Sequence, residues 1–231
     1  MYNMSQKLAA EFVGTFALIF FGAGSICANQ FLRTSGQGGF GLLGIALAQG
    51  LTMGAMVTSL GHISGGHFNP AITIGAWVTR KISTIDALIY WVAQLAGAMA
   101  AAYLLRLLPF DVWTAVQLGT PDLASGISRT NGMMFEAIMT FFLVFVFFAT
   151  VIDARGAFHK IAGFAVGLTV TIGALFGGPF TGAALNPARA FGPALGANHW
   201  TNHGVYWIGP LAGGVAAGYI YEILYLRKEI E

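Results

Sequence analysis

The sequence Asn69-Pro70-Ala71 occurs a second time, 117 positions later, as Asn186-Pro187-Ala188. Each copy opens a short apolar stretch, 69–78 and 186–196. Neither stretch can cross the roughly 30 Å hydrocarbon core of a membrane, because that takes about 20 helical residues. In both copies asparagine suits the N-cap of a helix and proline suits its first position. We therefore expect two half-helices that begin at the Asn-Pro-Ala sequences.

The composition indicates a membrane protein. The chain has 231 residues, of which 56% are hydrophobic and only 9% are charged, whereas a soluble domain carries about 25% charged residues. The net charge of +2 does not suggest nucleic acid as a partner. The single cysteine, Cys27, allows no intrachain disulfide and no cysteine-based metal cluster, and we expect no metal and no cofactor.

Six further stretches are apolar and long enough to cross the membrane as helices. The first follows Lys7, but it is longer than the apolar core of a signal peptide and it contains Glu11, so we expect it to remain as a helix. The six predicted spans cover about residues 8–28, 40–60, 84–107, 131–153, 158–178 and 205–225.

Further blocks repeat in the same order around the two Asn-Pro-Ala sequences. They are Glu11-x3-Thr15-Phe16 with Glu136-x3-Thr140-Phe141, Gly50-Leu51-Thr52 with Gly167-Leu168-Thr169, and Tyr90-Trp91 with Tyr206-Trp207. We therefore expect one domain over residues 1–231, built from repeats at about 7–108 and 131–226. Each repeat has three spans, so the second lies upside down relative to the first. The half-helices then enter from opposite sides and meet at the midplane.

The basic residues predict the orientation, because cytoplasmic loops carry an excess of lysine and arginine. With the N-terminus inside, seven basic residues lie on the cytoplasmic side and three on the other, which favours both termini inside. The seven are Lys7, Arg80, Lys81, Arg155, Lys160, Arg227 and Lys228, and the three are Arg33, Arg106 and Arg129.

Two half-helix ends that face each other create a polar site at the midplane. Each N-terminus presents about half a positive charge, so the pair repels cations, including hydronium. Asn69 and Asn186 use their side-chain oxygens on their own helices, which leaves amide N–H groups to donate to a passing molecule. The Gly-rich stretches 61–68 and 179–185 would line a water-filled lumen, since non-helical backbone at this depth needs protein or water around it.

Four other polar residues have two interpretations each. Glu11 and Glu136 lie within spans at equivalent places in the repeats, and their carboxylates either relay protons or brace the neighbouring loops; equivalence favours bracing. His62 and His67 flank the first loop, which precedes Asn69. They are candidates for lining the pore, and loop packing explains them equally well.

The segment 62–71, which reads HISGGHFNPA, and the segment 186–189, which reads NPAR, resemble the two signature loops of the aquaporin (major intrinsic protein) family. With the repeated Glu-x3-Thr-Phe blocks, the resemblance covers all six spans. It implies the aquaporin fold, an all-α membrane protein with six transmembrane helices and two re-entrant half-helices. It also implies a passive water channel, not an enzyme, that forms a homotetramer in lipid. Arg189 would narrow the outer pore, repel cations and hydrogen-bond the solute.

The resemblance also places a four-residue selectivity filter by spacing from the motifs, at Gln49, Ala174, Ala183 and Arg189. Strict water channels usually have Phe and His at the first two positions, and glycerol facilitators usually have Trp and Gly. This chain follows neither pattern and lacks the bulky groups, so we expect a wide filter that suits small polar neutral solutes. The stretch 201–210 looks most like plant tonoplast (vacuolar) intrinsic proteins, which pass water together with ammonia or urea.

The sequence therefore predicts a multi-pass water channel of the cell (inner or plasma) membrane, with a relaxed filter that also passes ammonia, urea or glycerol and excludes ions and protons. One alternative is a glycerol or metalloid-acid facilitator of the same family. Another is an ion-coupled secondary transporter, which also uses inverted repeats and broken helices. A transporter needs ligands for a coupling ion at the midplane, and none is evident beyond the two asparagines and Arg189.

Overall fold

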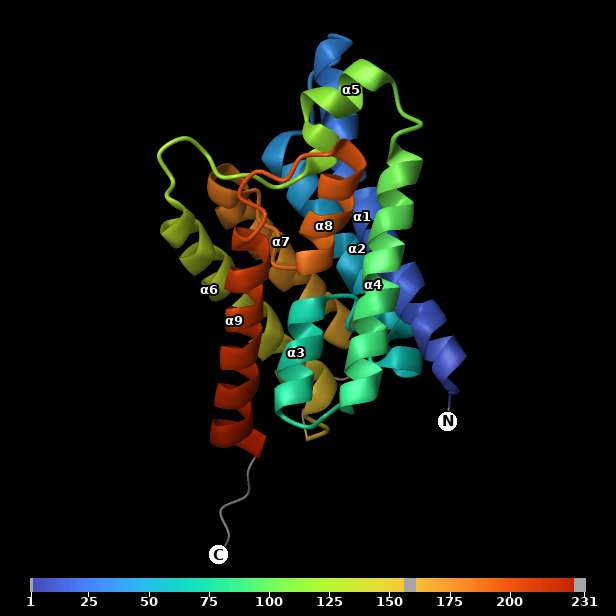
Figure 1. Cartoon of the computed structure of the whole chain (residues 1–231), viewed down its shortest axis with the longest axis vertical. Coiled ribbons are helices and arrows are strands. Elements are labelled where there is room, and N and C mark those ends of the chain that lie inside the picture. The colour runs from blue at the N-terminus through green and yellow to red at the C-terminus, as the bar shows by residue number, and fades with distance from the viewer. Residues whose placement is uncertain (1, 156–160, 227–231) are drawn as a thin grey trace, which may run out of the picture.

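The computed structural model describes residues 2–155 and 161–226, and this part of the chain is helical and contains no strand. Two short helices, α3 (Pro70–Val78) and α8 (Pro187–Ala197), approach each other end to end inside the bundle (Figure 1). The six long helices around them are α1 (Met4–Thr34), α2 (Gly41–Ser64), α4 (Thr84–Leu105), α6 (Arg129–Phe147), α7 (Ala162–Thr181) and α9 (Val205–Tyr221). This is the predicted fold class, and it is confirmed.

Five of the long helices, all except α9, are long and apolar enough to cross a membrane. Helix α9 has 17 residues, but it continues directly into the π-helical turn Glu222–Leu226. Together they span roughly 30 Å at 1.5 Å per residue. Helix α6 is extended in the same way by the π-helical turn Phe148–Ile152. The sixth predicted span is therefore present, with an irregular last turn.

Some sequence predictions fall outside the described residues. These are the first three residues of the span predicted at 158–178 and three of the basic residues used for orientation, Lys160, Arg227 and Lys228. The start of α1 and the end of α9 lie at the same end of the molecule (Figure 1). We call that end the inner face and the opposite end the outer face.

The two re-entrant segments are shorter than the sequence suggested. Helix α2 continues to Ser64 and α7 to Thr181, so the non-helical residues are 65–69 and 182–186, and not 61–68 and 179–185. Both helices end at a glycine in the left-handed region, Gly65 with φ 95° and Gly182 with φ 76°. Glycine adopts this conformation without steric cost and commonly ends helices. The two glycines therefore set the boundary.

The first helix begins at Met4, four residues before the predicted span 8–28, because its N-terminus is well capped. The Asn3 side chain accepts a hydrogen bond from the Gln6 backbone, and the Gln6 side chain accepts one from the Asn3 backbone, both at 2.9 Å. This reciprocal pair is a capping box, which satisfies two otherwise unpaired donors.

Between α4 and α6, residues 107–128 form an outer loop that crosses the outer face (Figure 1). It contains the short helix α5 (Phe110–Ala115) and a 3-10 turn, Gln117–Gly119. The side chain of Leu118 in this turn is fully buried, so the loop is anchored into the bundle. Neither element was predicted from the sequence.

Glycines let α9 pack closely on its neighbours. A Cβ atom at Gly213 would lie 2.1 Å from the carbonyl oxygen of Ala137 in α6, and one at Gly214 would lie 2.3 Å from that of Ala71 in α3. Small residues at helix contacts are typical of membrane bundles. This packing fixes the N-terminal end of α3, since Ala71 is the second residue of that helix.

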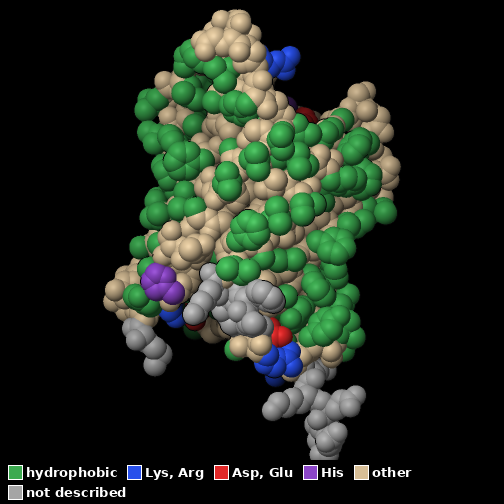
Figure 2. All heavy atoms as spheres, turned by 180° about the vertical axis from the view of Figure 1, so that it is seen from behind, with side chains coloured by type: hydrophobic (Ala, Val, Ile, Leu, Met, Phe, Trp, Pro, Cys, Tyr) green, Lys and Arg blue, Asp and Glu red, His purple; other side chains and the backbone are tan. Residues whose placement is uncertain are grey.

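The surface between the two faces is apolar. Figure 2 shows hydrophobic side chains over the middle of the molecule, with most of the visible charged groups near the inner end. Among the most exposed apolar side chains are Leu51, Ile85 and Phe164, each about 70% exposed. Exposed apolar area of this extent suits contact with lipid.

Candidate pore and selectivity filter

Each half-helix is capped at its N-terminus by an asparagine, as the sequence predicts. The Asn69 side-chain oxygen accepts a hydrogen bond from Ala71 N at 2.8 Å. The Asn186 side-chain oxygen accepts from Ala188 N at 2.9 Å and from Arg189 N at 3.3 Å. Proline occupies the first helical position in both helices, where its missing N–H costs nothing.

The two re-entrant segments are tied to each other by reciprocal hydrogen bonds. The Asn69 amide donates to the Leu185 carbonyl and the Asn186 amide donates to the Phe68 carbonyl, both at 2.9 Å. Phe68 and Leu185 both have positive φ, 49° and 53°, which turns their carbonyls out of the local backbone direction. An amide nitrogen carries two N–H groups, so each asparagine keeps one for a passing molecule and not two.

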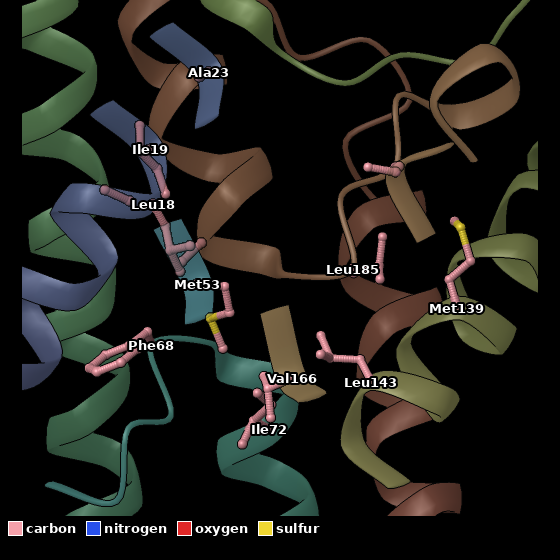
Figure 3. Close-up of a cluster of buried hydrophobic side chains, with 14 of the residues drawn as sticks. Leu18, Ile19, Ala23, Met53, Phe68, Ile72, Met139, Leu143, Val166 and Leu185 are labelled. Carbon is pink, nitrogen blue, oxygen red and sulfur yellow. The ribbon is translucent and has the colours of Figure 1, made fainter. Parts of the chain in front are cut away.

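A cavity lies where these ends meet. It has a volume of about 30 Å³ and its polar walls are Gln49, Asn69, Asn186 and Arg189. Roughly 10–15 Å³ is enough to hold one water, so the cavity accommodates a narrow file and not a bulky solute at rest. The apolar walls are Leu18, Met53, Leu143, Val170, Ala184 and Leu185; in Figure 3, Leu18 and Met53 lie on one side of this space and Leu143 and Leu185 on the other.

Arg189 is the strongest hydrogen-bond donor at the cavity. It lies in the first turn of α8 and is only 5% exposed. None of its three guanidinium nitrogens has a hydrogen-bond partner among the described residues. A buried cation without a partner is costly, and a polar solute in the cavity would supply the missing acceptors.

The structure brings together only part of the predicted filter. Gln49 from α2 and Arg189 from α8 share the cavity wall, whereas Ala174 and Ala183 are buried but do not belong to that wall. Ala184 contributes to it instead. The filter role of the two alanines predicted from spacing therefore stays a prediction.

Glu11 contacts the first re-entrant segment directly. One carboxylate oxygen accepts from Ser64 Oγ at 2.6 Å and from His67 N at 3.0 Å, and the other accepts from Phe68 N at 2.7 Å and Gln94 Nε2 at 2.7 Å. All four partners donate, so the carboxylate satisfies a group of buried donors. These are the contacts that the bracing interpretation requires.

Glu136 makes equivalent contacts in the second repeat. Its carboxylate accepts from Thr181 Oγ1 at 2.6 Å, from Ala184 N at 3.0 Å and from Leu185 N at 2.8 Å. The fourth donor is missing, because the position equivalent to Gln94 is Pro210. The two loops are therefore held alike at the backbone and differ in one side chain.

Three bracing side chains were not identified from the sequence. Tyr90 and Tyr206 donate to the carbonyls of Ser64 and Thr181, both at 2.8 Å. Their signal was available, because both belong to the repeated Tyr-Trp block. Gln94 was not predicted either; it is fully buried and donates to Thr73 Oγ1 at 3.0 Å as well as to Glu11.

The two histidines have different surroundings. His67 is buried, with its Nδ1 3.0 Å from Thr73 Oγ1 and its ring packed edge-on against Tyr90 and Phe147. His62 lies near the inner end of α2, edge-on against Tyr2, and lines a separate hollow between α2, the π-helical turn Phe148–Ile152 and α7. The structure therefore does not bring either histidine into the wall of the cavity between the half-helices.

Two half-helices that meet at a narrow polar cavity, inside a bundle of apolar spanning helices, define a multi-pass membrane channel. The family model described as major intrinsic protein matches residues 1–221. This chain belongs to the major intrinsic protein, or aquaporin, family; it is a channel for water and not an enzyme.

Similar proteins agree with this assignment. A probable aquaporin TIP3-2 from Arabidopsis thaliana is 45% identical over 222 residues, which cover 93% of this chain and 82% of that protein. Aquaporin TIP4-1 from Zea mays is 43% identical over 230 residues, which cover 97% and 88%. The X-ray structure of the aquaglyceroporin from Plasmodium falciparum has a TM-score of 0.85 at 24% identity and covers 96% of this chain and 97% of that chain, which shows a shared fold. An ion-coupled transporter gains no support from these similarities.

Proposed function

We propose that this water channel has a relaxed filter, formed around Gln49 and Arg189, that also passes small neutral solutes and excludes ions and protons. The observation that carries the proposal is the unpartnered guanidinium of Arg189 at the wall of the cavity. A fixed positive charge repels cations, and its free N–H groups offer hydrogen bonds to an uncharged solute.

The width of the filter is proposed from the small residues at the other two predicted positions. Ala174 and Ala183 are both buried, and an alanine at such a position carries none of the bulk of an aromatic or histidine side chain. Gln49 has a side chain that both donates and accepts, and no hydrogen bond to another described residue engages it. Ammonia, urea and glycerol can each satisfy both groups.

The half-helices support the exclusion of protons. The N-termini of α3 and α8 point their dipoles at the same cavity. The free N–H groups of Asn69 and Asn186 donate to a water at that place, so the water directs its own hydrogens outward and cannot accept a proton from its neighbour. Glu11 and Glu136 brace the loops that hold this geometry.

The domain organisation, the oligomeric state and the membrane of the channel are also proposals. We propose one channel domain of two inverted repeats, about 7–108 and 131–226, in a homotetramer embedded in lipid, with both termini in the cytoplasm. The apolar middle of the surface is consistent with both lipid and neighbouring subunits. We place the protein in the plasma (inner) membrane of the cell, and immunolabelling with organelle markers tests this.

Stopped-flow light scattering on proteoliposomes tests the function. We expect water to pass with a low activation energy, and urea, ammonia and glycerol to pass at lower rates without saturation. Exclusion of all three solutes would refute the relaxed filter and leave a strict water channel. Glycerol flux as fast as water flux would favour a glycerol or metalloid-acid facilitator.

A further inference from the structure

A network of polar side chains joins the outer loop to the two elements that carry the proposed filter. Its central residue is Asp122. One carboxylate oxygen accepts from Leu123 N at 2.8 Å and from Asn202 Nδ2 at 2.9 Å, and the other lies 3.0 Å from His199 Nε2. Arg129 Nε, at the start of α6, donates to Asn202 Oδ1 at 2.9 Å. We call these four side chains (Asp122, His199, Asn202 and Arg129) the outer clamp.

The clamp holds both sides of the re-entrant segment 182–186. On one side, the backbone of Pro121 and Asp122 lies directly against Gly182, where an added Cβ would be 2.8 Å from Pro121 Cα and 3.2 Å from Asp122 N. Gly182 precedes the proposed filter residue Ala183. A backbone bond from Ala124 N to Phe180 O, at 2.9 Å, fastens the same part of the loop to α7.

On the other side, the clamp holds the end of α8. His199 directly follows Asn198, which caps α8 in the left-handed conformation with φ 54°. Arg189 lies at the opposite end of this eleven-residue helix. A helix is stiff over this length, so displacement of its outer end moves the guanidinium at its inner end.

We propose that Asp122 is a positioning residue for the filter, which fixes the outer loop and α8 relative to each other and so sets the width at Arg189. This inference rests on the proposed filter. Loss of the clamp lets the outer loop and α8 move apart, and larger solutes gain more from the added width than water does.

The chemistry of the clamp makes it insensitive to pH in the wild type. Partial burial alone would raise the pKa of Asp122, but the hydrogen bonds from Asn202, His199 and Leu123 together lower that pKa below its ordinary value. The carboxylate is therefore ionised at neutral and mildly acidic pH. A carboxylate only accepts hydrogen bonds, so His199 donates from Nε2, and a protonated imidazole still donates there.

In an Asp122→Asn channel, by contrast, the clamp becomes sensitive to pH. Its single side-chain oxygen best serves Leu123 N and Asn202 Nδ2, because Asn202 cannot turn its amide over without losing Arg129. The new NH₂ group then points at His199 Nε2, which must accept. A neutral imidazole can accept and a protonated one cannot. The substitution therefore creates a contact that a neutral imidazole makes and a protonated imidazole loses.

The titratable and charged groups around His199 are few. Asp122 faces it from the outer loop, Arg129 acts through Asn202, and His203 lies in the turn before α9. His203 Nε2 accepts from Trp207 Nε1 at 2.9 Å, and burial lowers the pKa of His203. Any titration of His203 occurs in the wild type and in the variant alike, so the difference between them isolates the Asp122 contact.

The test is the glycerol-to-water permeability ratio of proteoliposomes at pH 8 and pH 5. In Asp122→Asn we expect the ratio to rise roughly fivefold on acidification, the factor that corresponds to about 1 kcal/mol of lost hydrogen bonding, while the wild type stays constant. The pH 8 sample shows that the variant folds. Asp111→Asn, which removes an exposed acid from α5 on the same face, controls for net charge.

A second variant assigns the effect to the clamp. In Asp122→Asn/His199→Gln the contact joins two amides that do not titrate, so the ratio should no longer depend on pH. A pH dependence that persists in the double variant, or none in Asp122→Asn, overturns the inference. Arg189→Val distinguishes failure of the clamp from failure of the filter. If Arg189→Val changes the permeability ratio and Asp122→Asn does not, the filter is upheld and the clamp is refuted. If Arg189→Val leaves the ratio unchanged, both the proposed filter and the clamp are refuted.

Discussion

Replacing Glu136 by glutamine should destabilise the protein by an amount that follows from the geometry. One carboxylate oxygen accepts from Ala184 N and the other from Leu185 N. An amide has only one oxygen, so its NH₂ group faces one of these backbone N–H groups in either orientation. A buried N–H left without an acceptor costs about 1–3 kcal/mol, and the remaining bonds lose the assistance of the charge, about 1 kcal/mol more. We expect Glu136→Gln to lower the free energy of unfolding by about 2–4 kcal/mol.

The chain offers a matched control on the same helix. Thr140 is fully buried one turn further along α6, and its hydroxyl has no hydrogen-bond partner among the described residues. In the first repeat, the Thr15 hydroxyl donates to the Glu11 carbonyl at 2.8 Å. Thr140→Val should therefore be neutral or slightly stabilising, whereas Thr15→Val should cost about 1 kcal/mol.

Equilibrium unfolding in mixed detergent micelles measures these free energies, and proteoliposome water flux shows the effect on the pore. We expect Glu136→Gln to lose water permeability along with stability, because Leu185 supplies the carbonyl that orients Asn69. A free energy of unfolding for Glu136→Gln within about 0.5 kcal/mol of the wild type, the usual range for an inconsequential substitution, would refute the bracing role of Glu136. A Thr140→Val variant that costs as much as Glu136→Gln would refute it too.

Three further predictions concern the pore. Arg189→Val removes the fixed positive charge, so water flow should persist while proton or cation leak rises in a pH-dye flux assay; unchanged ion exclusion would contradict its filter role. Gln49→Phe with Ala174→His restores bulk and should suppress urea and glycerol flux while water flux stays within roughly tenfold; a wild type that already excludes both solutes would disprove the wide filter. Mercuric chloride should not block the wild type, because the thiol of Cys27 is fully buried in an apolar groove, whereas Ala183→Cys should become sensitive and recover with a reducing thiol; block of the wild type that Cys27→Ser abolishes would place Cys27 at the pore.

The parts of the fold that depend on local chemistry were predictable from the sequence. Asn69-Pro70 and Asn186-Pro187 start helices through contacts within three residues, so the pattern alone gives the half-helices and, through their repetition, the inverted architecture. The ends of α2 and α7 were harder to predict, because apolar periodicity continues past the membrane depth at which a span was expected to stop. The left-handed Gly65 and Gly182 decide those ends, and glycine in a Gly-rich loop does not show which residue takes that role.

The parts of the site that depend on distant contacts were not predictable in the same way. Gln94 meets Glu11 and Thr73, 83 and 21 residues away, and nothing in a glutamine on an apolar span marks those partners. A comparison of the repeats could have singled it out, since the aligned residue is Pro210. Asp122 lies in the outer loop, which has no equivalent pattern, and its partners come from the turn between α8 and α9.

The reciprocal hydrogen bonds between the re-entrant segments have a consequence for how the protein is synthesised and inserted into the membrane. The carbonyl that holds the Asn69 amide belongs to Leu185, which is synthesised 116 residues later. At about 5–20 residues per second this is an interval of roughly 6–23 s. Throughout it, the first half-helix lies in the translocation machinery or the bilayer with its capping asparagine unanchored. A ribosome that stalls in the outer loop, between α4 and α6, therefore leaves three inserted long helices and a polar segment without its counterpart, which quality-control proteases can recognise long before any pore exists.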